Sequence, residues 1–352
     1  MEIKGHLDKA ELVFGRLLAA LAHKEYPYDR TEEPQVHSNL PPSLPLGKVE
    51  HARFLFYACL YMRGGIKSDE AIRRMSQLYG RHPSLFDPFS FSKRYKGDVE
   101  RVAGSLSDSG LGFGSGRVGG YWVLNSRKLA RFWSGDPRML FGGVSDYRGA
   151  CERIINGGLF SEDSSHGFLG FREKMVSMLI HFLAREGMIE SILFPPPVDF
   201  HILRVVLEHE VITVHDVKPE ENIFKLQLTD AVRALLVQYC EQHKADPLEL
   251  GAALWLLSRT LCKLHPGNGT RRVGEYWARR IVLVPVEVHW SSTQTRRYER
   301  GCGRCPVQGT CRFLIPSLPY YVKGRVEIRG FRRQPPQLHL FRDFVDTNTD
   351  MM

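Results

Sequence analysis

The chain of 352 residues is long enough to bury a large core and predicts one or two domains. Its composition, with 43% hydrophobic and 25% charged residues, is that of an ordinary globular protein, and it contains no apolar run long enough for a membrane span. It begins without an apolar signal segment, and its seven cysteines do not follow a disulfide framework. We therefore expect the cytoplasm, with nucleoid association in a prokaryote, or another reducing compartment.

Hydrophobic periodicity predicts a mainly helical protein. Five prolines between Tyr26 and Leu46 indicate a linker or a wrapped arm rather than a packed element. The glycine-rich stretch 110–120 lacks the Gly-Lys-Ser/Thr ending of a phosphate-binding loop, so we expect a flexible turn there. Apolar residues at helical spacing predict helices at about 7–24, 48–63, 67–80, 93–109, 126–134, 145–156, 170–186, 200–209, 229–242 and 246–262.

Two aspartates occupy positions where helix N-caps belong. Asp199 follows a run of three prolines and immediately precedes the apolar-periodic segment 200–209. Asp246 precedes Pro247, which suits the first turn of the next helix. Beyond that helix the pattern changes, and residues 280–290 and 320–328 are expected to form strands.

Three cysteines lie within ten residues, in the spacing Cys302-x2-Cys305-x5-Cys311. A C-x2-C pair lets a tight turn direct two thiolates at one metal centre, and a third cysteine can close round it. Four thiolates suit zinc or a [4Fe–4S] cluster, and we favour the cluster because structural zinc usually takes two paired knuckles. The alternative is a set of unrelated buried thiols. A fourth ligand would come from Cys262, Cys240, Cys151 or Cys59.

The positive charge of the chain is concentrated near its C-terminus. Residues 263–342 carry sixteen Lys and Arg against four Asp and Glu, a net charge of +12, whereas the whole chain carries +9 and the remainder therefore −3. A basic block of this size favours a polyanionic partner, most commonly nucleic acid. The alternative is a basic surface without such a partner.

Three motifs follow one another along the chain. The first is Gly167-Phe-Leu-Gly170-Phe-Arg-Glu-Lys174, the second is Val198-Asp-Phe-His-Ile-Leu-Arg-Val205, and the third is a helix ending at Cys262 with the cysteine loop after it. This arrangement resembles the helix-hairpin-helix DNA glycosylase superfamily, in particular endonuclease III and its iron–sulfur relatives. The family motifs are L-P-G-V-G-x-K, V-D-T-H-x-x-R-V and C-x6-C-x2-C-x5-C. The stretch 124–128 (LNSRK) also resembles the family sequence ahead of the hairpin, and the resemblance covers roughly 50–262 and 302–312.

The resemblance assigns roles to individual residues. It implies that Asp199 is the catalytic aspartate and that Lys174 stands where bifunctional members carry the lyase lysine. The implied ligands of a [4Fe–4S] cluster are Cys262, Cys302, Cys305 and Cys311. The implied contacts with DNA come from the hairpin residues Gly167, Gly170 and Arg172 and from the loop residues Arg304 and Arg312. A wedge for base flipping is expected after Tyr57, where Tyr61 and Arg63 are the candidates.

Each catalytic assignment has a plainer alternative. A carboxylate near the sugar C1′ stabilises the oxocarbenium character of base release or activates water, but Asp199 could instead be a plain N-cap. A lysine amine can attack C1′ and form a Schiff base, but Lys174 could be a solvated helix residue. His201 is interpreted as a structural residue rather than a base.

The sequence also departs from the family pattern. Arg172 replaces the second hairpin glycine, residues are inserted between Lys174 and Asp199, and thirty-nine residues separate Cys262 from Cys302. We expect an N-terminal helix and arm (1–47), a helical glycosylase-like core (48–262), a basic insertion with strands (263–301) and a cluster loop with a basic tail (302–352). The expected fold is mainly α and two-lobed, with a small β-containing basic C-terminal region.

The expected activity is that of a monomeric DNA glycosylase, with AP lyase activity as an open question, which acts on double-stranded DNA carrying a lesion or mismatch and has no membrane partner. Two other functions stay open. One is a non-catalytic iron–sulfur module of the same fold that binds nucleic acid. The other is a zinc-stabilised protein whose basic surface binds a protein partner.

Overall fold

The computed structural model describes residues 2–35, 37–62, 67–89, 98–112, 114–155, 167–215, 226–262, 271–273, 276–278, 282–284, 292–311, 325–327 and 332–333. The described chain is mainly helical, which confirms the predicted fold class at that level. None of the described helices is long and apolar enough to cross a membrane.

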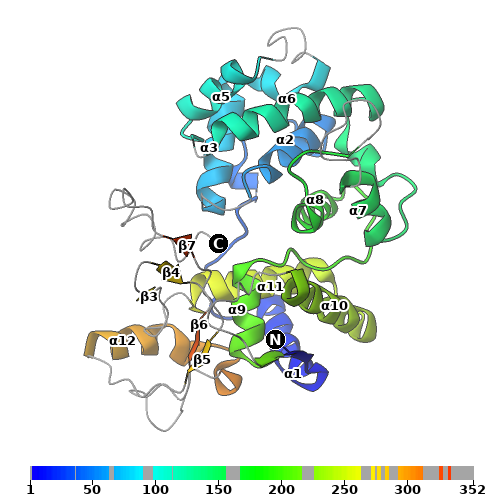
Figure 1. Ribbon diagram of the computed structural model, residues 1–352. Helices are drawn as coiled ribbons and strands as arrows, with labels where there is room; N and C mark the ends of the chain where they lie inside the picture. The colour runs from blue at the N-terminus through cyan, green and yellow to red at the C-terminus, as the bar shows by residue number, and fades with distance from the viewer. Residues whose placement is uncertain are drawn as a thin grey trace. The chain divides into compact units, whose positions relative to one another are not determined.

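The chain divides into two compact units. Unit 1 is built from Met1–Glu32 and Val198–Asp350, and unit 2 from Glu33–Pro197. Unit 1 contains α1 (Leu7–Ala22), α9 (Phe200–Glu208), α10 (Leu226–His243), α11 (Pro247–Thr260) and α12 (Ser292–Arg300) (Figure 1). Unit 2 contains α2 (Val49–Cys59), α3 (Ser68–Arg81), α5 (Val99–Asp108), α6 (Ser115–Phe132), α7 (Tyr147–Ile155) and α8 (Glu173–Arg185).

Unit 1 forms its core where α1, α9, α10 and α11 pack together. The N-terminal strand β1 (Glu2–Gly5) pairs antiparallel with β2 (Ile212–His215), and the register places Gly5 opposite Ile212. A Cβ atom on Gly5 would lie 2.8 Å from the Leu235 side chain, so glycine allows the strand to approach α10 closely. This pairing holds the N-terminus beside the segment that follows α9.

Five short strands of unit 1 form two further sheets. The strands β3 (Arg271–Val273), β4 (Tyr276–Ala278) and β7 (Arg332–Arg333) form a three-stranded antiparallel sheet with β4 in the centre. The strands β5 (Val282–Val284) and β6 (Arg325–Glu327) form an antiparallel pair. The strands β5 and β6 lie within the expected strand segments 280–290 and 320–328, and the other residues of those two segments are outside the described residues. The strands β3, β4 and β7 lie outside the expected segments.

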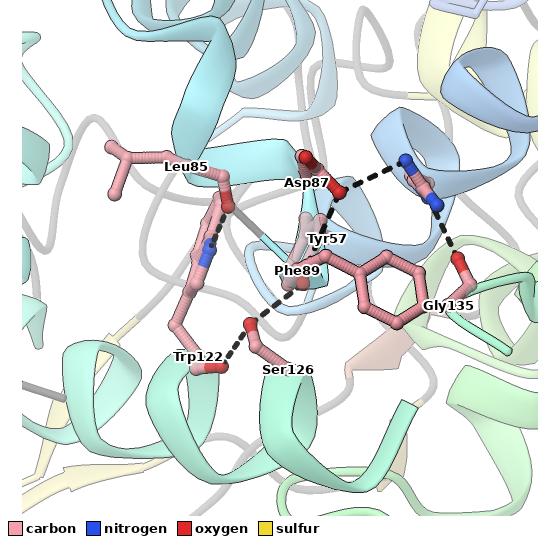
Figure 2. A network of polar contacts seen from close by, with 8 residues as sticks. Tyr57, Leu85, Asp87, Phe89, Trp122, Ser126 and Gly135 are labelled. Carbon is pink, nitrogen blue, oxygen red and sulfur yellow. Dashed lines mark hydrogen bonds and ion pairs between the residues drawn. The ribbon is translucent and has the colours of Figure 1, made fainter. Parts of the chain in front are cut away.

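Unit 2 buries an aromatic core that contains a polar network (Figure 2). The rings of Tyr57 and Trp122 stack with their centroids 4.3 Å apart. The Tyr57 hydroxyl lies 2.7 Å from Ser126 Oγ, which donates to the Trp122 carbonyl, and Trp122 Nε1 donates to the Leu85 carbonyl at 2.8 Å. These bonds satisfy the polar atoms that the aromatic residues bring into the core.

The glycine-rich stretch 110–120 is only partly a turn. We expected a flexible turn throughout, but α6 begins at Ser115 and includes Gly119. A Cβ atom on Gly119 would lie 3.1 Å from the carbonyl oxygen of Val99 on α5. Glycine at this position therefore allows α5 and α6 to pack closely, which local composition does not reveal.

The proline-rich arm is packed against the protein rather than a free linker. In unit 1 the buried Tyr28 hydroxyl donates to the Ala253 carbonyl on α11 at 2.9 Å. In unit 2 the arm residue Glu33 lies 2.8 Å from His181 Nε2 and 3.1 Å from the Arg185 guanidinium, both on α8. Burial opposes ionisation of Glu33, but its interactions with His181 and with the Arg185 guanidinium outweigh burial and lower its pKa.

Candidate functional site

The candidate site begins at the N-terminus of α9, where Asp199 caps the helix. Asp199 Oδ1 accepts hydrogen bonds from the backbone N–H groups of His201 at 2.8 Å and Ile202 at 3.3 Å. The run of prolines that ends at Pro197 stops any preceding helix, and Asp199 then adopts the extended backbone of an N-cap. The predicted cap is confirmed, and it fixes the carboxylate at the first turn of α9.

The buried face of α9 docks on α11 through polar contacts. His201 Nδ1 lies 3.2 Å from the Ser258 hydroxyl, and the His201 ring meets the Trp255 ring edge-on. One turn further along, the buried Arg204 guanidinium donates to the Ser258 carbonyl at 3.5 Å. His201 therefore has the structural setting that we expected, and both motif residues hold α9 on the helix that leads to Cys262.

The C-terminal end of α9 contacts the cysteine loop. The buried Glu208 carboxyl shares a hydrogen bond with the Cys262 thiol, and burial raises the pKa of Glu208 to about 8. His209 Nδ1 lies 2.8 Å from the Thr310 hydroxyl, next to Cys311, and burial lowers the pKa of His209 to about 4. Neither residue was singled out from the sequence, because Glu208 contacts a residue about fifty positions further along the chain and His209 one about a hundred positions further along.

The four predicted ligands lie in one region of unit 1. Cys262 and Cys302 belong to its hydrophobic core cluster, and Cys305 and Cys311 pack against that cluster. All four cysteines are free of disulfide bonds. Burial raises the pKa of the Cys262 thiol well above its usual value, with further increases from the nearby Glu208, Cys305 and Cys311, and burial raises the pKa of Cys305 to about 12.

Four thiols are the donor type that a four-thiolate metal centre takes. Thiols buried this deeply ionise when a metal cation lies among them, because the cation offsets the cost of burying the thiolates. Within the described part of the chain, no three Cys, His, Asp or Glu side chains are gathered as closely as the ligands of a metal ion. The four thiols are therefore suitable in donor type, and a metal centre among them belongs to the proposal below.

The cysteine loop is also tied to the N-terminal arm. The exposed Arg304 guanidinium lies over the Tyr26 ring, 4.1 Å from its centroid. The Tyr26 hydroxyl donates to the Arg300 carbonyl at the end of α12 at 3.0 Å. Arg304, an expected DNA contact, is thus held at the surface by an aromatic ring, whereas Arg312 lies outside the described residues.

In unit 2, the expected hairpin is a tight turn that leads into α8. Gly170 has a φ of +83°, a conformation that favours glycine. The Phe168 N–H donates to the Ile154 carbonyl at 2.8 Å, which returns the chain to the end of α7. Arg172 is exposed and stands at the N-cap of α8, where its side chain is available to a phosphate.

Two side chains of α6 hold this turn. Asn125 is fully buried and forms two hydrogen bonds with Leu169. Asn125 Nδ2 donates to the Leu169 carbonyl at 2.9 Å, and the Leu169 N–H donates to Asn125 Oδ1 at 2.8 Å. Lys128 Nζ donates to the Gly167 carbonyl at 2.6 Å, and burial lowers the pKa of Lys128. The segment 124–128 thus fixes the turn through side-chain hydrogen bonds. Only its resemblance to the family motif drew attention to this segment in the sequence.

Lys174 is half-buried in the first turn of α8, and its Nζ donates to the Met62 carbonyl at 3.2 Å. It is therefore not a fully solvated lysine. Tyr61 is buried and its hydroxyl donates to the Leu111 carbonyl at 3.1 Å, so the structure does not present Tyr61 as a wedge. The other wedge candidate, Arg63, lies outside the described residues.

No model of a known protein family matches the chain, and no curated protein matches its sequence significantly.

Proposed function

We propose that the protein is a DNA glycosylase of the helix-hairpin-helix type, which cleaves the N-glycosidic bond of a damaged, mismatched or modified base flipped out of a DNA duplex. The observation that carries the proposal is the role of α9 in unit 1. Asp199 caps the start of this helix. At its other end, Glu208 and His209 contact the four-cysteine region. Its sequence VDFHILRV is also the stretch that most resembles the family.

Asp199 supplies the charge that base release requires. Departure of the base leaves positive charge on the sugar, and a fixed carboxylate stabilises that charge or activates the attacking water. The two backbone hydrogen bonds to Oδ1 fix the side chain before substrate binds. Preorganisation of this kind lowers the cost of orienting the carboxylate in the transition state.

Lys174 supplies the chemistry for a second step, strand cleavage. Its amine bonds to the sugar C1′ as the base leaves and loses a proton, and the C1′–O4′ bond then breaks, with protonation of O4′, to give the ring-opened Schiff base. Loss of a C2′ proton then eliminates the 3′ phosphate. The hydrogen bond from Nζ to the Met62 carbonyl positions the amine at the start of α8.

The four cysteines Cys262, Cys302, Cys305 and Cys311 would hold a [4Fe–4S] cluster. Bound there, the cluster supplies a rigid cross-link rather than a reaction step. It would fix the loop that carries Arg304, and the turn at Gly170 would offer backbone groups and Arg172 to a DNA phosphate.

A second candidate function is a non-catalytic DNA-binding module. Two observations favour it: Asp199 already serves as an N-cap, and Arg172 occupies the place of a hairpin glycine. Both functions predict salt-sensitive binding to DNA.

The test is base release from a panel of duplexes, each with one lesion or mismatch, by protein that contains its cluster. We expect release from at least one duplex, loss of release in Asp199→Asn, and loss of borohydride trapping in Lys174→Arg, which keeps the positive charge but cannot form a Schiff base. Tight binding to the panel without release by the wild type would support the binding module and contradict the glycosylase.

A further inference from the structure

Helix α11 is buried along most of its length, and Trp255 interrupts that burial. From Leu250 to Ser258 every other residue is buried, whereas Trp255 is only half-buried, and so is Arg259 one turn further along. Residues four positions apart lie on the same side of a helix, so these two side chains reach solvent at one place. The roles proposed above for α9 and the cysteines leave this pair unused.

The two side chains stack on each other. The guanidinium carbon of Arg259 lies 4.8 Å from the centroid of the Trp255 ring. A guanidinium that stacks on an aromatic ring does so with its flat face, and its N–H groups point outward in the plane, where they donate to other partners. The contact therefore orients Arg259 before any ligand binds, which lowers the entropic cost of binding one.

The pair lies beside the start of the helix that Asp199 caps. Helices α9 and α11 pack side by side in unit 1 (Figure 1). His201 links the two places, because its ring centroid is 5.7 Å from that of Trp255 and its backbone N–H donates to Asp199 Oδ1 at 2.8 Å. Asp199 is itself half-buried. A partly exposed carboxylate and a partly exposed, stacked guanidinium therefore flank the same histidine.

This combination of charges suits a DNA strand. A carboxylate that acts on a nucleotide also repels the phosphates on either side of that nucleotide, so a cation nearby is needed to hold the strand in place. Arginine is the cation best matched to phosphate, because its planar fork of donors binds two phosphate oxygens at once. The position of Arg259 close to Asp199 thus favours a backbone phosphate as its ligand.

We propose that Arg259 binds a backbone phosphate adjacent to the flipped nucleotide, and that Trp255 is the positioning residue that orients its guanidinium. The inference rests on the proposed function for the nature of the ligand, which is DNA. It adds two residues to which the sequence assigned no role.

The test is the affinity of the full-length protein for a fluorescein-labelled duplex that contains one tetrahydrofuran, a stable analogue of an abasic nucleotide. This probe has no base to release, so anisotropy measures binding without reaction. We expect Arg259→Ala to weaken binding roughly tenfold or more, the loss of a charge-assisted hydrogen bond. The slope of log affinity against log salt should fall by about 0.9, as for one phosphate contact.

Two further variants separate the geometry of the guanidinium from its charge. Arg259→Lys keeps the charge but loses the planar fork, so it should keep the salt slope and lose part of the affinity. Arg16→Ala is the matched control, because it removes an exposed arginine from α1 of the same unit, and it should leave the affinity almost unchanged. Equal affinities of Arg259→Ala and the wild type would overturn the proposal.

A double-mutant cycle tests the role of Trp255. Trp255→Leu keeps an apolar side chain without the ring, so it should weaken binding in the wild type but have no further effect in Arg259→Ala. Trp255→Phe, which keeps a ring for the guanidinium and disturbs packing less, should retain most of the affinity. An equal loss from Trp255→Leu in both backgrounds, or a loss from Trp255→Phe as large as that from Arg259→Ala, would overturn the positioning role.

Base release from a lesion duplex is scored separately. Release by the wild type, with unchanged binding by Arg259→Ala, would contradict this inference alone. Weakened binding by Arg259→Ala, without release by the wild type, would contradict the glycosylase alone. A wild type with no affinity for the duplex would contradict both.

Discussion

The side-chain amide of Asn125 forms both of its hydrogen bonds with a single residue, Leu169, which lies 44 positions further along the chain. An amide that both donates to and accepts from one peptide unit fixes the position and the orientation of that unit. The turn that precedes α8, with Gly170 and Arg172, is therefore held by α6 and not only by its own sequence.

The first prediction concerns this clamp. Asn125→Asp keeps the acceptor for the Leu169 N–H but loses the donor to its carbonyl, and the side chain is fully buried. We expect the free energy of unfolding to fall by about 2 kcal/mol, since a buried carbonyl loses its partner and a carboxylate is buried. Asn39→Asp is the control, because the side chain of the exposed Asn39 donates to the Pro34 carbonyl at the protein surface and not in the core. Equal losses in both variants, measured by chemical denaturation, would contradict the clamp.

The second prediction separates two glycines of unit 2. Gly170 has a φ of +83°, so Gly170→Ala should destabilise the protein by about 1–2 kcal/mol. Gly116 lies in the first turn of α6, and a Cβ atom there would meet nothing within 4 Å. Gly116→Ala should therefore stabilise the protein by about 0.5–1 kcal/mol. Thermal denaturation of the two variants should give shifts of opposite sign, and shifts of the same sign would contradict the geometry of the turn.

The third prediction concerns the metal centre. Cys305→Ser should lose the brown colour and broad visible absorption of a [4Fe–4S] protein, together with its iron and acid-labile sulfide. Cys151→Ser, at a cysteine of unit 2 outside the four-cysteine region, should keep all of these properties. A colourless wild type that contains zinc after anaerobic preparation would show that the four thiols hold zinc and that the cluster assignment is wrong.

The fourth prediction concerns pH. Burial lowers the pKa of His209 from 6.5 to about 4, so the unfolded chain binds a proton at this residue between those two pH values whereas the folded chain does not. The contribution of His209 to the free energy of unfolding is therefore fully present above pH 6.5. It falls by up to about 3 kcal/mol as the pH decreases from 6.5 to about 4. His209→Asn keeps a partner for Thr310 and removes the titrating ring. The difference in unfolding free energy between wild type and variant should depend on pH in this window, and a constant difference would refute the assignment.

Local sequence signals predicted much of the fold. The two aspartate caps are correct, with Asp199 and Asp246 each accepting backbone hydrogen bonds at the start of a helix. Helices with a one-sided apolar stripe were also placed within a few residues, as for α8, predicted at 170–186 and observed at Glu173–Arg185. Caps and stripes are local features, and the chain folds locally as they require.

The features that were missed depend on contacts between distant segments. The helical start of α6 at Ser115 was mistaken for a turn, because the benefit of Gly119 lies in its approach to Val99 on another helix. The burial of Glu208 and His209 depends on the cysteine loop, and nothing in their own neighbourhood indicates it. Spacing alone grouped only Cys302, Cys305 and Cys311, and the assignment of Cys262 as the fourth ligand came from the family resemblance and stays a prediction.

The most direct test of the central claim compares two aspartates of unit 1 that cap helices in the same way. Asp199 Oδ1 accepts from His201 N at 2.8 Å, and Asp246 Oδ1 accepts from Leu248 N at 2.8 Å. Asparagine caps helices as well as aspartate does, so Asp199→Asn and Asp246→Asn should both keep the fold and change stability little.

The measurement is single-turnover base release by these two variants and the wild type on the preferred lesion duplex. We predict that Asp199→Asn loses release by a factor of about 100 or more, because the charge that stabilises the transition state is gone, while Asp246→Asn matches the wild type. Equal release by all three proteins would contradict the catalytic role of Asp199 and leave it as a helix cap.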